Sequence, residues 1–489
     1  MPSLAVAALT AVFAWACAAF VRQPMLATFA DDSVTYLVMA QAFSPWQPAS
    51  APVAEAFLRE GFYPPLFPLV LALAGAAHDI SRAHVVTALM LAACLPVLYL
   101  FSATLMNRWA AVASVAVTAI LPAMWINAKG ILSEPLYCLA LLMFLWAAQR
   151  RLIGWLVVSA AALVLTRTAG LALVAAYAVW ALTQRDRVKL LVPAAVALVA
   201  YGAWVAMRPA GDINVAYLSE SPWRLDIGRQ AASIAEAWIG SLIIYWVDDR
   251  PLRTALAAAA GLLALTGLFL RLKERKPDGW IMLAYLATFL AWPFHDQMGR
   301  FIFPALPVLV VYAFHAGGIL LRRPATGYAV AAVLYVSLAA PAAAFLYQRA
   351  VAPAPYPQMV DWYRYPDWRE AQARADVHLG LLDDMRAIAE RTRPDERVMW
   401  VTPAYIALLA GRHGVPTPEY RQEAEGFRKA LLASRADYIF LSTYHPRETV
   451  SDAAWRASQQ ALRGHVDVVH ERRRGEAVVS LLLRPRRLP

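Results

Sequence analysis

The sequence predicts a polytopic α-helical membrane protein with a soluble α/β domain at its C-terminal end. Three observations support this fold class. Of the 489 residues, 60% are hydrophobic and 16% are charged, whereas soluble domains are about 45–50% apolar and about 25% charged. Long apolar segments recur over residues 1–348, with short charged loops between them. After residue 348 these segments stop and polar residues dominate.

Eleven apolar segments are the predicted membrane spans. A span needs about 20 mostly apolar residues, and several of these segments are slightly shorter. Because eleven is an odd number, the two ends of the chain are expected on opposite sides of the membrane. The segments are 4–21, 84–104, 110–127, 134–148, 152–166, 168–183, 188–207, 252–271, 279–294, 300–321 and 326–347.

The loops between the segments alternate in charge. Every second loop is basic, and the positive-inside rule places these loops in the cytoplasm. The N-terminus is therefore predicted to be cytoplasmic and the C-terminal domain extracytoplasmic, in a multi-pass protein of a plasma membrane such as the bacterial inner membrane. The basic loops carry Arg108; Arg150 and Arg151; Arg185, Arg187 and Lys189; Arg271, Lys273, Arg275 and Lys276; and Arg322 and Arg323.

Two further apolar stretches would break this alternation if they crossed the membrane. Residues 62–77 contain a double proline, and a crossing there would place Arg108 outside. A crossing at residues 231–247 would move the basic loop at residues 271–276 outward. Both stretches are therefore predicted to be helices that lie in the outer interface.

Residues 349–489 are predicted to form an α/β domain, and this length is enough for a core of its own. Residues 396–403 have the pattern of a buried strand, and residues 404–411 that of a short helix before a glycine-flanked turn. Residues 427–444 are typical of a helix followed by a strand. Residues 465–484 predict a hairpin with a charged turn.

Two adjacent carboxylates, Asp31 and Asp32, follow the first apolar segment. The stretch after them has the spacing of a short amphipathic helix, for which one Asp would serve as an N-terminal cap. A carboxylate at the outer membrane surface can also act as a general base on an acceptor hydroxyl. The residues alone leave cap and catalyst as equal alternatives.

Lys129 and Glu134 stand at predicted outer ends of adjacent spans. One interpretation is a cation for phosphate and a carboxylate for a sugar hydroxyl. The other is a lysine that snorkels to the interface and a polar helix start with proline in its first turn. The spacing slightly favours the second.

Arg167 and Arg300 also stand at predicted outer boundaries, the latter close to His295 and Asp296. Charge beside lipid is costly and marks candidate functional sites, so these four residues are candidate substrate-binding residues. The fork-shaped guanidinium in particular suits phosphate. The alternative is an ion pair with Asp296 or Glu134 that stabilises the bundle. For His295 alone, a satisfied interfacial side chain is the simpler interpretation.

Other classes of site lack support in the sequence. The net charge of +11 does not indicate nucleic-acid binding, because the basic residues form short clusters between apolar runs. The sequence contains no zinc-ligand spacing, phosphate-binding loop or dinucleotide fingerprint, or nucleophile elbow. No metal site is predicted. A divalent cation beside the carboxylates is an alternative that the sequence neither indicates nor rules out.

Five segments in this order resemble the polytopic lipid-linked glycosyltransferases of the GT-C superfamily, especially the branch of protein mannosyltransferases and aminoarabinose transferases. They are "DDSVTYLVMAQAF", "GFYPPLFPLVLAL", "ILSEPLYCLALLMFLW", "LVLTRTAGLALVAAYAVW" and "GRFIFPALPVLVVYA". The resemblance covers residues 1–320 and implies a transmembrane catalytic domain over residues 1–348. It also implies a soluble domain of the kind formed by residues 349–489.

The resemblance implies roles for residues near the first external loop. The family places its catalytic Asp four residues before a Tyr, which here gives Asp32 ahead of Tyr36. Where many members have a second acid after the Asp, this chain has Ser33 and carries Asp31 on the other side, so both aspartates are catalytic candidates. Many members carry a charged residue or His ahead of the "PPL" element, where this chain has Tyr63. The contact with phosphate or acceptor expected at this position is assigned to Tyr63, with Lys129 as the alternative.

The resemblance further implies an inverting transfer of a sugar from a polyprenyl-phosphate donor to a glycan, lipid or protein acceptor, with no cofactor required. Arg300, with Arg167 or Lys129, is expected to hold the phosphate, and Glu134 to orient the sugar. The alternative is a transporter or flippase of a lipid-linked sugar, which would need the cations but no base. Transporters often show internal repeats, and we find none in the sequence.

Overall fold

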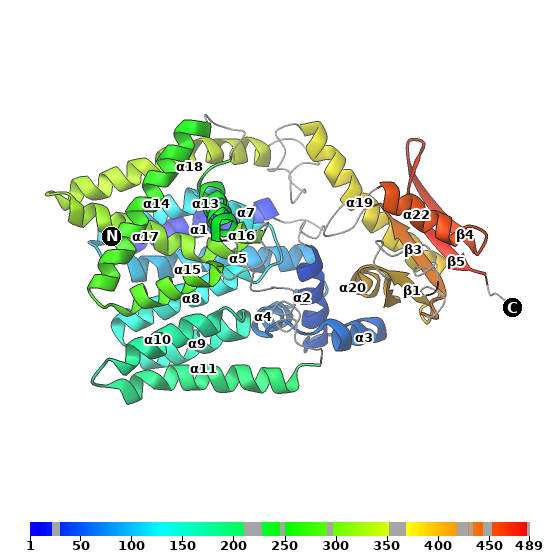
Figure 1. Ribbon diagram of the computed structural model, residues 1–489, viewed down its shortest axis with the longest axis horizontal. Helices are drawn as coiled ribbons and strands as arrows, with labels where there is room; N and C mark the ends of the chain where they lie inside the picture. The colour runs from blue at the N-terminus through cyan, green and yellow to red at the C-terminus, as the bar shows by residue number, and fades with distance from the viewer. Residues whose placement is uncertain are drawn as a thin grey trace.

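The computed structural model describes residues 1–21, 30–209, 227–244, 250–290, 297–351, 368–417, 429, 434–443 and 452–486. Its N-terminal part is a helical bundle, and its C-terminal part is a small sheet with flanking helices (Figure 1). The N-terminus lies at the end of the bundle opposite to the C-terminal domain, and the connection between α10 and α11 lies at that same end.

Each of the eleven predicted spans contains a helix. By length and composition, six helices in the described part are long and apolar enough to cross a membrane, or seven if the bent pair α6–α7 is one span. The helices are α1 (Pro2–Val21), α5 (Ile80–Ser102), α6 (Arg108–Ile120) with α7 (Pro122–Ala128), α8 (Glu134–Arg150), α9 (Ile153–Thr166), α10 (Gly170–Leu182), α11 (Arg187–Met207), α14 (Arg250–Lys273), α15 (Pro277–Leu290), α16 (Met298–Ile302) with the 3-10 turn η2 (Phe303–Ala305) and α17 (Leu306–Leu320), and α18 (Pro324–Val351).

Glycines allow α17 to pack closely against its neighbours. A Cβ on Gly267 of α14 would lie 2.1 Å from the Tyr312 carbonyl oxygen of α17. A Cβ on Gly327 of α18 would lie 1.9 Å from the Gly317 carbonyl oxygen of α17. Small residues permit such backbone contact between membrane helices. Accordingly, 89% of the most apolar stretch within residues 298–320 is buried.

Among the described residues, the bundle also contains four shorter helices: α2 (Ala30–Ala42), α3 (Ala51–Glu60), α4 (Leu66–Leu73) and α13 (Ile227–Leu242). The two stretches predicted to lie in the interface contain α4 and most of α13. With 8 residues, α4 is about 12 Å long, too short to cross a bilayer. In Figure 1, α2 runs across the direction of α8 to α11, at the end of the bundle nearest the C-terminal domain.

The C-terminal domain is built on a five-stranded sheet of order β2-β1-β3-β5-β4. Strand β1 is parallel to β2 and β3, whereas β5 is antiparallel to β3 and β4. The elements are α19 (Trp368–Arg391), β1 (Arg397–Trp400), α20 (Pro403–Tyr405), the π turn η5 (Ile406–Ala410), β2 (His413–Pro416), β3 (Tyr438–Ser442), α22 (Asp452–Leu462), β4 (Val466–Arg474) and β5 (Ala477–Pro485).

The strand pattern of this domain follows the predicted one. The strand expected at 396–403 and the hairpin expected at 465–484 are both present. Gly411 has φ 62° in the expected turn, a conformation that glycine adopts at low cost. The helix expected at the start of 427–444 falls mostly outside the described residues. Alternate side chains of β1 face opposite sides of the sheet: Trp400 packs in one core and Met399 in the other.

Candidate active site

Two acids and two arginines from four separate elements form one buried charge cluster, which consists of Asp32, Glu134, Arg167 and Arg300. Arg300 lies at its centre: its Nη2 donates to Asp32 Oδ2 at 2.8 Å, and its Nε donates to Glu134 Oε1 at 2.7 Å. Arg167 Nη1 lies 2.9 Å from the same Glu134 oxygen. Positions 32 and 300 are 268 residues apart in sequence, so tertiary folding brings them together.

Local structure explains how each side chain reaches the cluster. Asp32 and Glu134 lie in the first turns of α2 and α8, where the helix dipole favours negative charge. Arg167 ends α9 in an extended conformation, with φ −150° and ψ 140°. Arg300 belongs to the five-residue helix α16. The alternative pairing of an arginine with Glu134 is therefore present, and Asp32 is a second partner of Arg300.

Aromatic side chains surround the charges. The Tyr63 hydroxyl donates to Asp32 Oδ1 at 2.6 Å, and its ring centroid lies 5.0 Å from that of Tyr36. The Phe301 ring lies under both guanidinium groups, at 4.8 Å from Arg167 and 6.0 Å from Arg300, where cation–π attraction adds to the ion pairs. Both carboxylate oxygens of Asp32 thus accept hydrogen bonds from side chains outside its own helix, an arrangement that a helix cap alone does not require.

Asp32 is the most accessible acid of the cluster. Its side chain is 26% exposed, compared with 1% for Glu134, and Arg167 at 17% is more accessible than Arg300 at 7%. Burial raises the pKa of Asp32, but the charge of Arg300, the hydrogen bonds from Tyr63 and Arg300, and the charge of Arg167 outweigh it. The pKa of Asp32 is therefore below its usual range, and its carboxylate is ionised at neutral pH.

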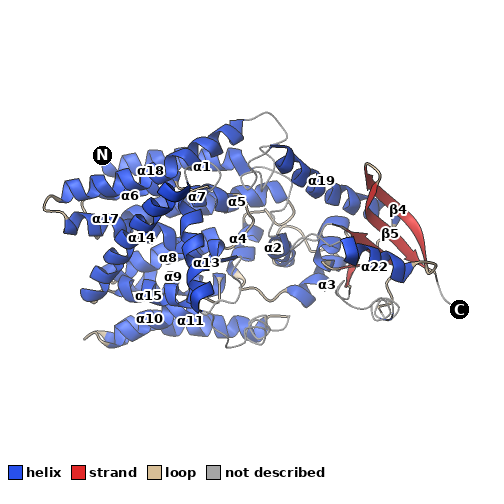
Figure 2. Ribbon diagram, turned by 45° about the horizontal axis from the view of Figure 1, so that its top comes forward, coloured by secondary structure: helices blue, strands red, loops and turns tan. Residues whose placement is uncertain are grey.

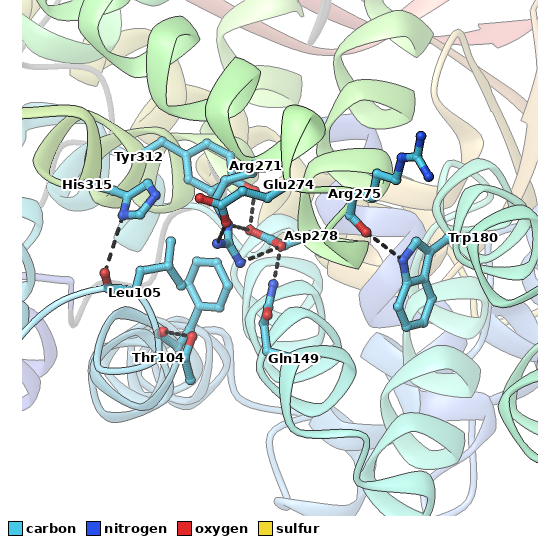
Figure 3. Close-up of polar contacts among 11 residues, drawn as sticks. Thr104, Leu105, Gln149, Trp180, Arg271, Glu274, Arg275, Asp278, Tyr312 and His315 are labelled. Atoms are coloured by element: carbon cyan, nitrogen blue, oxygen red, sulfur yellow. Dashed lines mark hydrogen bonds and ion pairs between the residues drawn. The ribbon is translucent and has the colours of Figure 1, made fainter. Parts of the chain in front are cut away.

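A second buried ion pair gives a useful contrast (Figure 3). Asp278, at the start of α15, accepts two hydrogen bonds from Arg271, at 3.0 and 3.1 Å, and one from Tyr312 at 3.0 Å. Gln149 donates to it as well. Both oxygens of Asp278 are satisfied, as a structural ion pair requires. In the charge cluster, by contrast, Glu134 Oε2 is buried and has no hydrogen-bond partner among the described residues.

The other predicted site residues are placed as follows. Lys129 ends α7 and is 1% exposed. Asp31 lies in the first turn of α2, but its side chain falls outside the described residues, as do His295 and Asp296. Within the described part of the chain, no group of three His, Cys, Asp or Glu side chains could hold a metal ion.

Ser133 and Phe301 are members of the site that the sequence did not predict. Ser133 Oγ accepts from Arg167 Nη1 at 3.1 Å and lies 2.9 Å from the Tyr36 hydroxyl. Each of the two missed residues directly adjoins a predicted one, Glu134 or Arg300, and this adjacency is the only signal in the sequence.

Neither the family models nor the curated proteins match this sequence. Solved structures do resemble it. ArnT from Cupriavidus metallidurans in the apo state gives a TM-score of 0.57 at 14% identity, covering 98% of this chain and 96% of that one. The same protein bound to undecaprenyl phosphate gives 0.53 at 14% identity, covering 97% of each. The chain therefore shares its overall fold with ArnT.

A third structure extends this likeness of fold. The archaeal oligosaccharyltransferase AglB from Archaeoglobus fulgidus, in complex with an inhibitory peptide and a dolichol-phosphate, gives a TM-score of 0.53 at 13% identity. The match covers 97% of this chain and 74% of that one. The predicted fold class, a polytopic helical membrane protein with a soluble C-terminal domain, is confirmed.

Proposed function

We propose that this chain is an inverting glycosyltransferase, which moves a sugar from a polyprenyl-phosphate carrier to an acceptor hydroxyl on the outer side of the membrane. The observation that carries the proposal is the contact of Asp32 with Arg300: an accessible carboxylate lies directly beside a cation suited to phosphate. The GT-C fold supports it, because two matched structures hold undecaprenyl phosphate and dolichol-phosphate.

In this proposal Asp32 is the general base. The acceptor oxygen forms a bond to the anomeric carbon of the sugar while the bond from that carbon to the phosphate oxygen breaks. The acceptor proton passes to a carboxylate oxygen of Asp32, and the polyprenyl phosphate leaves with the bonding electron pair. A single displacement of this kind inverts the anomeric centre. A positioned base contributes about 10²–10⁴-fold.

The arginines stabilise the leaving phosphate. Arg167 is the more accessible of the two and is assigned the first contact, with Arg300 behind it and Lys129 as a third cation. Each preorganised charge-stabilising group is worth about 10²–10³-fold. As phosphate oxygens take up the arginine charge, the pull of that charge on Asp32 weakens and the pKa of Asp32 rises. Donor binding thus strengthens the base when it is needed.

The remaining predicted residues have supporting roles in the proposal. Glu134 holds both arginines through one oxygen, and its free oxygen is available to orient the sugar. Tyr63 fixes the Asp32 carboxylate. Asp31, His295 and Asp296 keep the roles that the sequence predicts for them, as a second catalytic acid and two substrate-binding residues.

The proposed function requires a defined placement of each domain relative to the membrane. In the proposal, residues 1–348 form the transmembrane catalytic domain with a cytoplasmic N-terminus, and residues 349–489 form the extracytoplasmic domain. The acceptor is a glycan, a lipid or a protein.

The direct test is a transfer assay with purified protein, a radiolabelled polyprenyl-phosphate sugar and a panel of hydroxyl acceptors. We expect label in the acceptor together with an equal amount of free polyprenyl phosphate. A transporter or flippase would move the donor in proteoliposomes without consuming it, and that result would overturn the proposal.

A further inference from the structure

The C-terminal domain shares a hydrophobic core with the helix that carries Asp32. One cluster of buried side chains includes Tyr36 and Leu37 of α2 together with Trp400, Tyr405 and Ile406 of the C-terminal domain. In Figure 2, α2 and α3 lie between the main bundle and the sheet. The domain is therefore packed directly against α2, the helix that carries Asp32, and against α3.

Polar contacts fasten the same domain to α3. Glu55 Oε2 accepts from His413 Nδ1 at 2.5 Å, and Glu55 Oε1 lies 3.8 Å from Arg397 Nη2. Arg59 Nη1 donates to the Gly414 carbonyl oxygen at 2.9 Å. Arg397 and His413 are register partners on the parallel strands β1 and β2, so one carboxylate of α3 meets two neighbouring side chains at the edge of the sheet.

Helix α3 leads directly to Asp32. It ends at Glu60, and Tyr63 follows three residues later. The Tyr63 hydroxyl donates to Asp32 Oδ1 at 2.6 Å, and its ring packs on Tyr36 of α2. The position of α3 therefore determines where the Tyr63 hydroxyl lies, and this hydroxyl holds one of the two Asp32 oxygens.

We propose that Glu55 is a positioning residue, through which the C-terminal domain holds α3 and so keeps Tyr63 against Asp32. This inference rests on the proposed function, because it concerns the geometry of the general base. Small displacements of a reacting group can cost about 10²-fold in rate, even when the substitution is far from the chemistry. Glu55 contacts none of the residues assigned to the phosphate. We therefore expect a substitution of Glu55 to change kcat and not KM for the donor.

The test compares Glu55→Gln with Glu471→Gln in the transfer assay. Both glutamates are partly exposed, at 38% and 30%, and both pair with a basic residue of the C-terminal domain, but Glu471 lies on β4, away from α3. We expect Glu55→Gln to lower kcat about tenfold with KM for the donor within about twofold of the parent. Glu471→Gln should leave both constants unchanged. Equal loss in the two variants, or kcat of Glu55→Gln within about twofold of the parent, would overturn the inference.

A double-mutant cycle and hydrogen exchange complete the test. His413→Asn should lower kcat as Glu55→Gln does, and the double variant should fall no further, because each change weakens the same charge-assisted contact between Glu55 and His413. Multiplying effects would contradict the inference. Amide exchange over residues 30–42 and 51–60 should be faster in Glu55→Gln and unchanged over α8 and α17. This readout needs no turnover: if the parent shows no transfer, the proposed function fails, whereas unchanged exchange in α2 and α3 refutes the positioning role.

Discussion

Replacing Asp32 with asparagine removes the base while keeping most of its contacts. The side-chain oxygen of Asn still accepts one hydrogen bond, and Arg300 keeps its ion pair with Glu134. A hydrogen bond to a charged group is worth about 1.5–3 kcal/mol, and this carboxylate is partly exposed, so the stability loss should lie at or below the lower end of that range. The rate should fall by about 10²–10⁴-fold, because the proton acceptor is gone.

The assay for Asp32→Asn is the release of free polyprenyl phosphate per mole of monodisperse protein in detergent. The matched comparison is Asp31→Asn, which makes the same change one residue earlier in α2. We expect Asp31→Asn to lower kcat less than Asp32→Asn does, since Asp32 is the acid that contacts Arg300 and Tyr63. Turnover of Asp32→Asn within tenfold of the parent, or a greater loss in Asp31→Asn, would refute the assignment of the base.

Three further predictions address acid–base behaviour and stability. The pKa of Asp32 is lowered from an ordinary value of about 3.9, so the carboxylate stays ionised as the pH falls, until the pH reaches the lowered pKa. We therefore expect kcat/KM to stay flat down to about pH 5. A fall in kcat/KM that begins above pH 5 would contradict this assignment. Asp278→Asn breaks a buried ion pair and should lower the free energy of unfolding by about 3–5 kcal/mol. We expect a lower unfolding temperature in detergent, while the folded fraction keeps its kcat. An unchanged unfolding temperature would contradict the structural role of Asp278. Gly267→Ala should lower the yield of monodisperse protein, because the added Cβ would collide with the backbone of α17. Gly202→Ala is the control and should not lower the yield, because no atom lies within 4 Å of a Cβ at that position. Equal yields of the two variants would contradict the close packing of α14 against α17.

Hydropathy and charge predict the helices well, because a span is a local property of about 20 consecutive residues. Helices occur in every predicted span, and the hairpin at the end of the chain follows from its alternating pattern. Charges next to apolar segments also marked Glu134, Arg167 and Arg300, since such side chains need partners. All these predictions depend only on residues that are close together in the sequence.

Partners far apart in sequence were harder to predict. The sequence offers Asp296 or Glu134 as alternative ion-pair partners of the arginines. The second partner of Arg300 is Asp32, which lies 268 residues away. Tyr63 was predicted to contact substrate, and its described hydrogen bond goes to Asp32. Apolar periodicity indicates that a face is buried but not what buries it. For this reason the sequence predicts a separate core for residues 349–489, whereas part of that core is shared with α2.

The most direct test of the central claim is a structure of the protein with a bound polyprenyl phosphate. We expect the phosphate oxygens to lie within hydrogen-bond distance of Arg167 or Arg300, with Asp32 on the side open to the acceptor. A phosphate bound at the Arg271–Asp278 pair, or anywhere out of reach of both arginines, would contradict it.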